Sequence, residues 1–101
     1  MKAKLRFQSK ITLIHGRSME IAIAELKVWD LPVSAGYPLG LKYSLFLVAK
    51  ESGKVIVGFD NHKPKGPHLH HDEKEIIYKF SDVDTLIEDF WNYVRKEGYT
   101  L

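Results

Sequence analysis

The sequence predicts an α+β fold, in which an antiparallel sheet of four to five strands is covered by one C-terminal amphipathic helix. Two observations lead to this prediction. Polar and apolar residues alternate through most of the first 60 positions, as in strands that have one buried face. The last quarter instead spaces its apolar residues at helical intervals. Without the helix, one face of the sheet would lack a covering layer.

Five segments read as strands, and turns separate most of them. The tetrapeptide at 15–18 contains the glycine that a hairpin turn favours, and 51–54 is a second turn of this kind. The predicted strands are Lys4–Ile14, Met19–Trp29, Leu41–Lys50, Val55–Phe59 and Lys74–Phe80.

The segment Met19–Trp29 allows two interpretations. Its alternation favours a strand, whereas its alanine and glutamate residues also suit a helix. We predict a strand there. The following segment, Asp30–Gly40, contains two prolines and two glycines, and we expect a long loop of the kind that often carries function.

The predicted helix begins after Ser81, which is expected to cap it together with Asp84 three residues later. Arg95 and Lys96 fall in the last turn and Gly98 ends it, which agrees with the helix dipole and with C-cap preferences. The apolar stripe comprises Val83, Leu86, Ile87, Phe90, Trp91 and Val94.

Length and composition limit the possible classes of protein. A chain of 101 residues is expected to form a single domain spanning 1–101. The absence of cysteine excludes disulfide frameworks, zinc ribbons and thiol catalysis, and it fits a cytoplasmic protein. No apolar run approaches the roughly 18 residues of a membrane span, so we expect no membrane association. The formal charge of +2 permits nucleic-acid binding without requiring it.

The segment Asp60–His71 holds the residues best suited to chemistry, because it carries four of the five histidines. His68 and His70 would project to the same face of an extended chain, and His71 to the other. Such a pair can act as general acid and general base. Further groups in the segment could assist: Asp60 could orient an imidazole, Lys63 and Lys65 supply positive charge, and Gly66 allows close approach of backbone N–H groups to an anion.

Two other interpretations of this segment remain open. It could be an ordinary solvated loop rich in histidine. Alternatively, the His-x-His pair together with Asp60 could bind zinc, nickel or copper. We predict no metal and no cofactor, because the spacing matches no known closed metal site and hard evidence for a third ligand is missing.

Aromatic and basic residues elsewhere have simpler interpretations. Tyr43 shares a strand face with Leu45, so its expected place is the core. Tyr37 and Trp29 flank the long loop and could stack on a base. The alternating basic residues near the N-terminus indicate a solvent-exposed sheet face. A cationic face of this kind would also favour binding of an RNA backbone. His15 lies in a predicted turn and is expected to be structural or solvent-exposed.

Several of these motifs together resemble the TumE family, the toxin components of prokaryotic toxin–antitoxin systems. The resemblance covers roughly Trp29 to Arg95. It rests on Lys42-Tyr43-Ser44-Leu45, Phe59-Asp60-Asn61, Lys65-Gly66-Pro67-His68-Leu69-His70 and Tyr78-Lys79-Phe80-Ser81-Asp82-Val83-Asp84. Pro64, Pro67 and His71 depart from the family pattern.

The resemblance implies a toxin that acts on RNA metabolism or translation and is neutralised by a cognate helix-turn-helix antitoxin. On this basis we predict a metal-independent ribonuclease. His68 and His70 would be its acid and base, and Lys65 would stabilise the developing charge. Asp60 would orient a histidine, and Tyr43 would be an auxiliary hydrogen-bond donor. Asn61, Lys63 and Gly66 are predicted to contact substrate or phosphate. The alternatives are a non-catalytic module that binds nucleic acid or protein, and a metal-dependent hydrolase. The open edge of a small sheet also makes a homodimer plausible.

Overall fold

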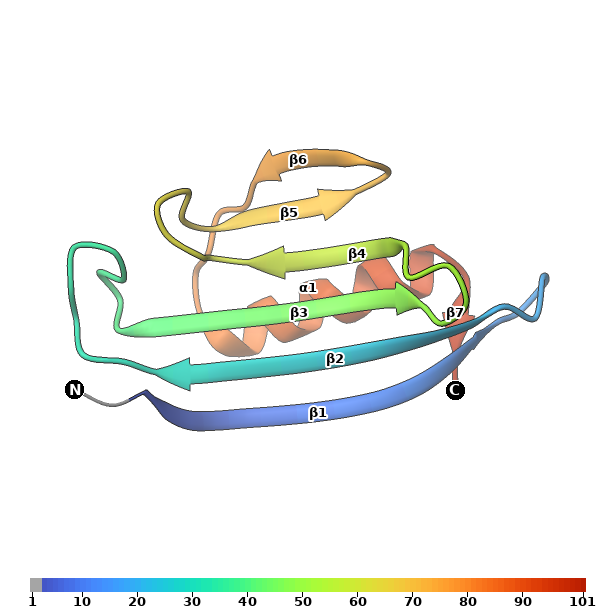
Figure 1. Cartoon of the computed structure of the whole chain (residues 1–101), viewed down its shortest axis with the longest axis horizontal. Helices are drawn as coiled ribbons and strands as arrows, with labels where there is room; N and C mark the ends of the chain where they lie inside the picture. The colour runs from blue at the N-terminus through green and yellow to red at the C-terminus, as the bar shows by residue number, and fades with distance from the viewer. Residues whose placement is uncertain (1–2) are drawn as a thin grey trace.

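The computed structural model describes residues 3–101 and forms one seven-stranded antiparallel sheet with a single helix (Figure 1). The strands follow one another across the sheet in the order β6-β5-β4-β3-β2-β1-β7. The predicted α+β class is confirmed, but the predicted number of strands, four to five, is wrong. The elements are β1 (Lys4–His15), β2 (Ile21–Asp30), β3 (Leu41–Ala49), β4 (Val55–Asp60), β5 (His68–His71), β6 (Lys74–Ile77), α1 (Val83–Lys96) and β7 (Tyr99–Thr100).

The strand interpretation of the segment from Met19 to Trp29 is confirmed by β2. Its alternating residues Ala22, Ala24, Leu26 and Val28 are all buried, whereas the residues between them are partly exposed. This two-residue period is what a strand with one buried face requires. Packing across the sheet therefore outweighs the helical preference of alanine and glutamate.

The two unpredicted strands, β5 and β7, are short. β5 has four residues and β7 has two. β5 and β6 form a hairpin whose turn residues Asp72 and Glu73 both have positive φ, at 52° and 61°. Turns of this kind usually contain glycine or asparagine. The hairpin could not be predicted from the sequence, because its turn residues are Asp and Glu. The predicted strand Lys74–Phe80 ends earlier, at Ile77.

The helix α1 is present as predicted, but its N-cap is Asp82 and not Ser81. Asp82 has the extended backbone of a cap residue, and its carboxylate accepts a hydrogen bond from the Thr85 N–H at 2.7 Å. Hydrogen bonding to Thr85 lowers the pKa of the Asp82 carboxyl. Asp84 then lies in the first helical turn, where its charge complements the helix dipole.

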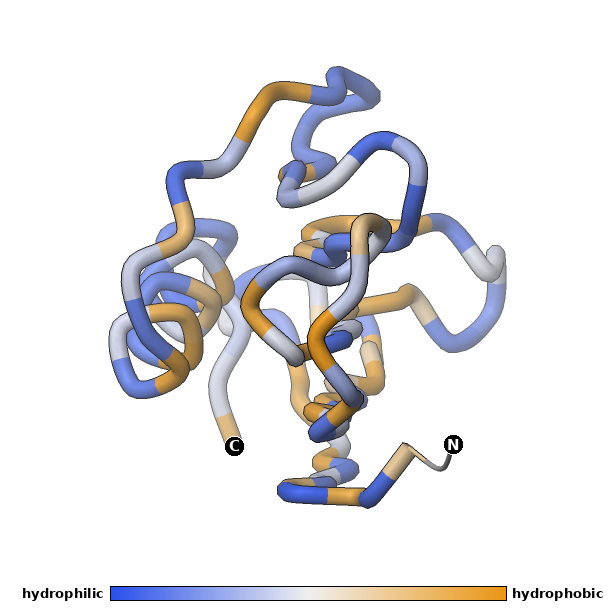
Figure 2. The backbone as a smooth tube through the Cα atoms, turned by 90° about the vertical axis from the view of Figure 1, so that its left-hand side faces the viewer, coloured by the Kyte–Doolittle hydropathy of each residue, from blue (hydrophilic) through white to orange (hydrophobic). Residues whose placement is uncertain are grey.

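The core lies between α1 and one face of the sheet, and the other face carries no helix among residues 3–101 (Figure 2). Leu86, Phe90 and Val94 of the predicted stripe are buried against this sheet face. Phe59, the last residue but one of β4, packs its ring on Phe90. The face without a helix, which we call the open face, is therefore available for a site. The described part of the chain contains no helix with the length and apolar character that a membrane crossing needs.

Candidate functional site

Strand register brings three of the predicted site residues together on the open face. Asp60 of β4 pairs with His68 of β5, and His70 pairs with Gly58. Directly paired residues of antiparallel strands point to the same face. Because Phe59 and Leu69 between them are buried in the core, Asp60, His68 and His70 point away from α1.

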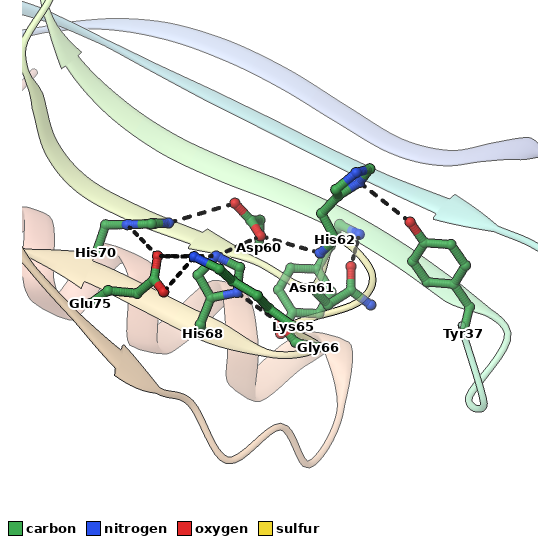
Figure 3. Close-up of polar contacts among 10 residues, drawn as sticks. Tyr37, Asp60, Asn61, His62, Lys65, Gly66, His68, His70 and Glu75 are labelled. Carbon is green, nitrogen blue, oxygen red and sulfur yellow. Dashed lines mark hydrogen bonds and ion pairs between the residues drawn. The ribbon is translucent and has the colours of Figure 1, made fainter. Parts of the chain in front are cut away.

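The carboxylate of Asp60 lies between the two imidazoles (Figure 3). Nε2 of His68 is 3.0 Å from Oδ1 of Asp60, and Nε2 of His70 is 3.8 Å from Oδ2. The two rings have centroids 4.7 Å apart and planes at 79°. The side-by-side arrangement expected from the His-x-His spacing is therefore present, with the acid next to it.

His68 is fixed at both ring nitrogens. Its Nδ1 lies 2.8 Å from the carbonyl oxygen of Gly66, which can only accept, so this nitrogen carries hydrogen. Its Nε2 faces the Asp60 carboxylate, which also accepts. A ring protonated on both nitrogens satisfies both contacts, and a cation bound at Nε2 is the alternative. His68 is 7% exposed, whereas a third of the His70 side chain is accessible to solvent.

Glu75, which the sequence analysis missed, connects Lys65 to the histidines. Lys65 Nζ donates to both carboxylate oxygens of Glu75, at 2.8 and 3.0 Å. Glu75 lies opposite His70 in the β5–β6 hairpin, with 3.6 Å between Oε2 and Nδ1 of His70. The hydrogen bond from Lys65 lowers the pKa of the Glu75 carboxyl. Glu75 therefore lies between Lys65 and the imidazole pair.

Phe46 forms an apolar wall beside His70 and was also missed. The two ring centroids are 6.1 Å apart. Phe46 pairs with Gly58, and a side chain at Gly58 would collide with the Phe46 ring. Glycine inside a strand commonly marks such a close approach, so Gly58 was the signal in the sequence.

The structure does not bring Tyr43 to the imidazole pair. Ser44 is the register partner of Asp60 and shares its face of the sheet. Tyr43 precedes Ser44 in β3, so its side chain lies on the opposite face, toward α1. Its ring stacks on Phe80 with centroids 5.5 Å apart, and its hydroxyl is buried without a hydrogen-bond partner. Burial, with a smaller contribution from the charge of Asp60, raises the pKa of this hydroxyl.

Asn61 and Lys63 also lie away from the pair. The side-chain amide of Asn61 accepts from the Tyr43 N–H at 2.9 Å and donates to the Leu41 carbonyl at 2.8 Å. It therefore extends the contact between β3 and β4 beyond Asp60. Lys63 extends toward the β2–β3 loop, with Nζ 6.0 Å from the ring centroid of Tyr37.

The same cluster has the composition of a metal site. Asp60, His68 and His70 each offer one ligand atom, and these atoms lie within 4.8 Å of one another. Asp60 is the carboxylate that the metal interpretation of the sequence placed beside the His-x-His pair, and the fold brings its oxygen to both imidazoles. A backbone carbonyl on the second nitrogen, as Gly66 provides for His68, is typical of metal-binding histidines. The arrangement therefore suits proton transfer and also suits a divalent metal ion.

A family model described as Toxin TumE matches residues 3–97. The chain belongs to the TumE family. The match covers nearly the whole chain and extends the resemblance found between Trp29 and Arg95 into β1 and β2. Membership gives this TumE chain a toxin role and implies an antitoxin partner. No curated protein and no solved structure matches it.

Proposed function

We propose that this TumE chain is a toxin that acts on RNA, and that it cleaves phosphodiester bonds at the Asp60–His68–His70 cluster. The observation that carries the proposal is the position of two imidazoles on either side of one carboxylate, on the face of the sheet that α1 leaves open. Lys65 lies within the same group through Glu75. These are the groups that a metal-independent cleavage of RNA needs.

In the proposed reaction, the ribose 2′-oxygen attacks the adjacent phosphorus, and the 5′-oxygen of the next nucleotide leaves. His70, the more exposed imidazole, takes the proton of the 2′-hydroxyl. His68, whose two ring nitrogens contact the Gly66 carbonyl and the Asp60 carboxylate, gives a proton to the leaving oxygen. Asp60 orients both rings, and Lys65 exchanges Glu75 for the phosphate as negative charge builds up. The products are a 2′,3′-cyclic phosphate and a free 5′-hydroxyl.

The open face carries lysines suited to contacts with an RNA backbone, with Glu25 between two of them. Lys27 pairs with Ser44 and Ser44 with Asp60, so Lys27 lies in the same row across the sheet as the cluster. Lys10 and Lys42 point to the same face by alternation and register. Lysines along the path of a nucleic acid contribute affinity that does not depend on sequence.

Growth inhibition tests the proposal. Inducible expression of the wild-type chain in bacteria should stop growth, and His70→Ala should restore it, because loss of an acid–base group lowers rates by about 100- to 10,000-fold. His71→Ala is the matched control, since His71 belongs to the same strand but contacts Glu97 on the other side. Thermal melts of the purified variants check folding. A toxic His68→Ala/His70→Ala double variant would refute the proposal.

A metal-dependent hydrolase is the second candidate, and the convergence of Asp60, His68 and His70 favours it. A bound divalent metal would activate water in place of the imidazole base. Titration calorimetry with zinc or manganese tests this directly, with Asp60→Asn as the variant that removes one ligand. In this case a chelator should abolish RNA cleavage and added metal should restore it, whereas the acid–base mechanism is insensitive to both.

The antitoxin is proposed to be a helix-turn-helix protein, and the chain to act in the cytoplasm. A homodimer is proposed to form through an edge strand, and β6 is the stronger candidate because Ile76 and Ile77 are 52% and 91% exposed. Sedimentation of the wild-type chain and of Ile77→Lys tests this proposal. A monomer at all concentrations contradicts it.

A further inference from the structure

A groove opens beside the candidate site, between the β2–β3 loop (31–40) and the β4–β5 loop (61–67). Both loops lie at the same end of the sheet, at the left of Figure 1. We call it the loop groove. Its volume is about 740 Å³, which falls within the roughly 300–1,000 Å³ of small-molecule sites. Leu39, Leu41, Pro64 and Pro67 make most of its wall apolar.

The polar groups of the loop groove suit an anion with an aromatic part. Its lining includes Tyr37, His62 and Lys63 but no carboxylate. By contrast, the groove lined by Glu20, Asp72, Glu73 and Glu97 at the other end of the sheet is acidic. The charge of the loop groove therefore complements a phosphate, and the ring of Tyr37 offers a surface on which a base can stack.

The two loops are held against each other by Tyr37 and Lys63. A Cβ at Gly36 would come within 2.8 Å of Lys63 Cδ, so the lysine side chain crosses close to the backbone at Gly36. The Lys63 ammonium lies 6.0 Å from the Tyr37 ring centroid. The Tyr37 hydroxyl lies 3.5 Å from Nδ1 of His62 (Figure 3). These contacts position the ring and the charge before any ligand binds.

Two residues that line the loop groove adjoin the imidazole pair and Asp60. Asn61, in its lining, follows Asp60 in the chain, and Gly66, also in its lining, accepts the hydrogen bond from His68. A nucleotide with its base in the groove would therefore lie beside the ends of β4 and β5, the strands that carry Asp60, His68 and His70.

We propose that the loop groove binds one base of a single-stranded RNA, with the base stacked on Tyr37 and the neighbouring phosphate held by Lys63. This inference rests on the proposed action on RNA. It assigns the choice of cleavage position to the loop groove and the chemistry to the cluster.

Binding of a short oligonucleotide that cannot be cleaved tests the inference. The probes are fluorescent 2′-O-methyl hexanucleotides of uridine and of adenosine, since a methylated 2′-oxygen cannot attack phosphorus. Fluorescence anisotropy should show that Tyr37→Leu weakens binding about 5- to 150-fold. Tyr37→Phe, which keeps the ring and loses the hydroxyl, should bind nearly as tightly as the wild type.

Lys96→Ala is the matched control for Lys63→Ala, because it also removes a lysine that lies near a tyrosine ring. Lys96 Nζ lies 5.6 Å from the ring centroid of Tyr93, at the end of α1 and far from the two loops. Lys63→Ala should weaken binding and reduce its salt dependence, and Lys96→Ala should leave both unchanged. Thermal melts of each variant confirm folding.

The outcomes separate the inference from the proposed function. If the wild type binds neither probe, or if Tyr37→Leu binds as tightly as the wild type, the loop groove does not hold a base, even where RNA is still cleaved. If binding depends on Tyr37 while ordinary RNA stays intact, the inference holds and the proposed cleavage fails.

Discussion

At the scale of single residues, Asp60 and Asn61 at the end of β4 perform separate tasks. The carboxylate of Asp60 lies between two imidazoles, and the amide of Asn61 is bonded to the backbone of β3. The amide bonds fix the strand end from which Asp60 projects. Asn61 is therefore better described as a positioning residue than as the substrate contact expected from the sequence.

Tyr43→Phe tests the role of the buried tyrosine. The Tyr43 hydroxyl has no hydrogen-bond partner, and an unpaired buried polar group costs about 1–3 kcal/mol. Its removal should raise the free energy of unfolding by up to that amount in urea denaturation, and it should leave growth inhibition intact. Loss of toxicity in a folded Tyr43→Phe variant would restore the auxiliary donor role predicted from the sequence.

At the scale of elements, the β5–β6 hairpin decides how the site is built. The hairpin carries both histidines on one strand and Glu75 on the other. Its register places Glu75 opposite His70, and a shift of one residue would turn every side chain to the wrong face. The site therefore depends on the hairpin as a unit.

The helix cap gives a prediction at this scale. Asp82→Ala should lower the melting temperature at neutral pH, whereas Ser81→Ala should change it little, because only Asp82 accepts the Thr85 N–H. Hydrogen bonding makes the folded-state pKa of Asp82 lower than its ordinary value of 3.8. The contribution of the Asp82 carboxylate to the free energy of unfolding is therefore complete above the ordinary pKa. It disappears as the pH falls through the folded-state pKa.

Thermal melts across acid pH measure this dependence. The difference between wild type and Asp82→Ala should be largest near neutrality and should vanish in strong acid. An equal effect of Ser81→Ala would contradict the assignment of the cap.

At the scale of the whole molecule, one helix stabilises one face of the sheet and leaves the other for function. Phe90 is fully buried between α1 and β4, where it meets Phe59. Phe90→Ala should cost about 3–5 kcal/mol, a large part of the roughly 5–15 kcal/mol that stabilises a typical domain. Urea denaturation measures the loss, and Glu88→Ala, on the exposed side of the same helix, is the control. A small effect at Phe90 would contradict the assigned core.

Much of this architecture could be predicted from the sequence because β1 to β4 and α1 are long enough to show their period. Even the ambiguous β2 was decided by alternation. β5 and β7 could not be predicted, because four and two residues carry no usable period and the β5–β6 turn lacks glycine. Ser81 and Asp82 are both good cap residues, so only backbone geometry separates them.

The predictability of the site follows the same division. Asp60, His68 and His70 could be grouped in advance because they lie within one short segment. Glu75 and Phe46 reach the cluster only through pairing between strands. No local sequence pattern determines the register of that pairing. Tyr43 lies in the core, as its strand face predicts, and only its motif had suggested a place in the site.

The most direct test of the proposed chemistry is the identity of the ends produced from a single-stranded RNA by the purified chain in the presence of a chelator. The acid–base account predicts fragments that end in 2′,3′-cyclic phosphate, and their formation should fall about 100- to 10,000-fold in His70→Ala. Intact RNA, or fragments formed equally by wild type and His70→Ala, would contradict it.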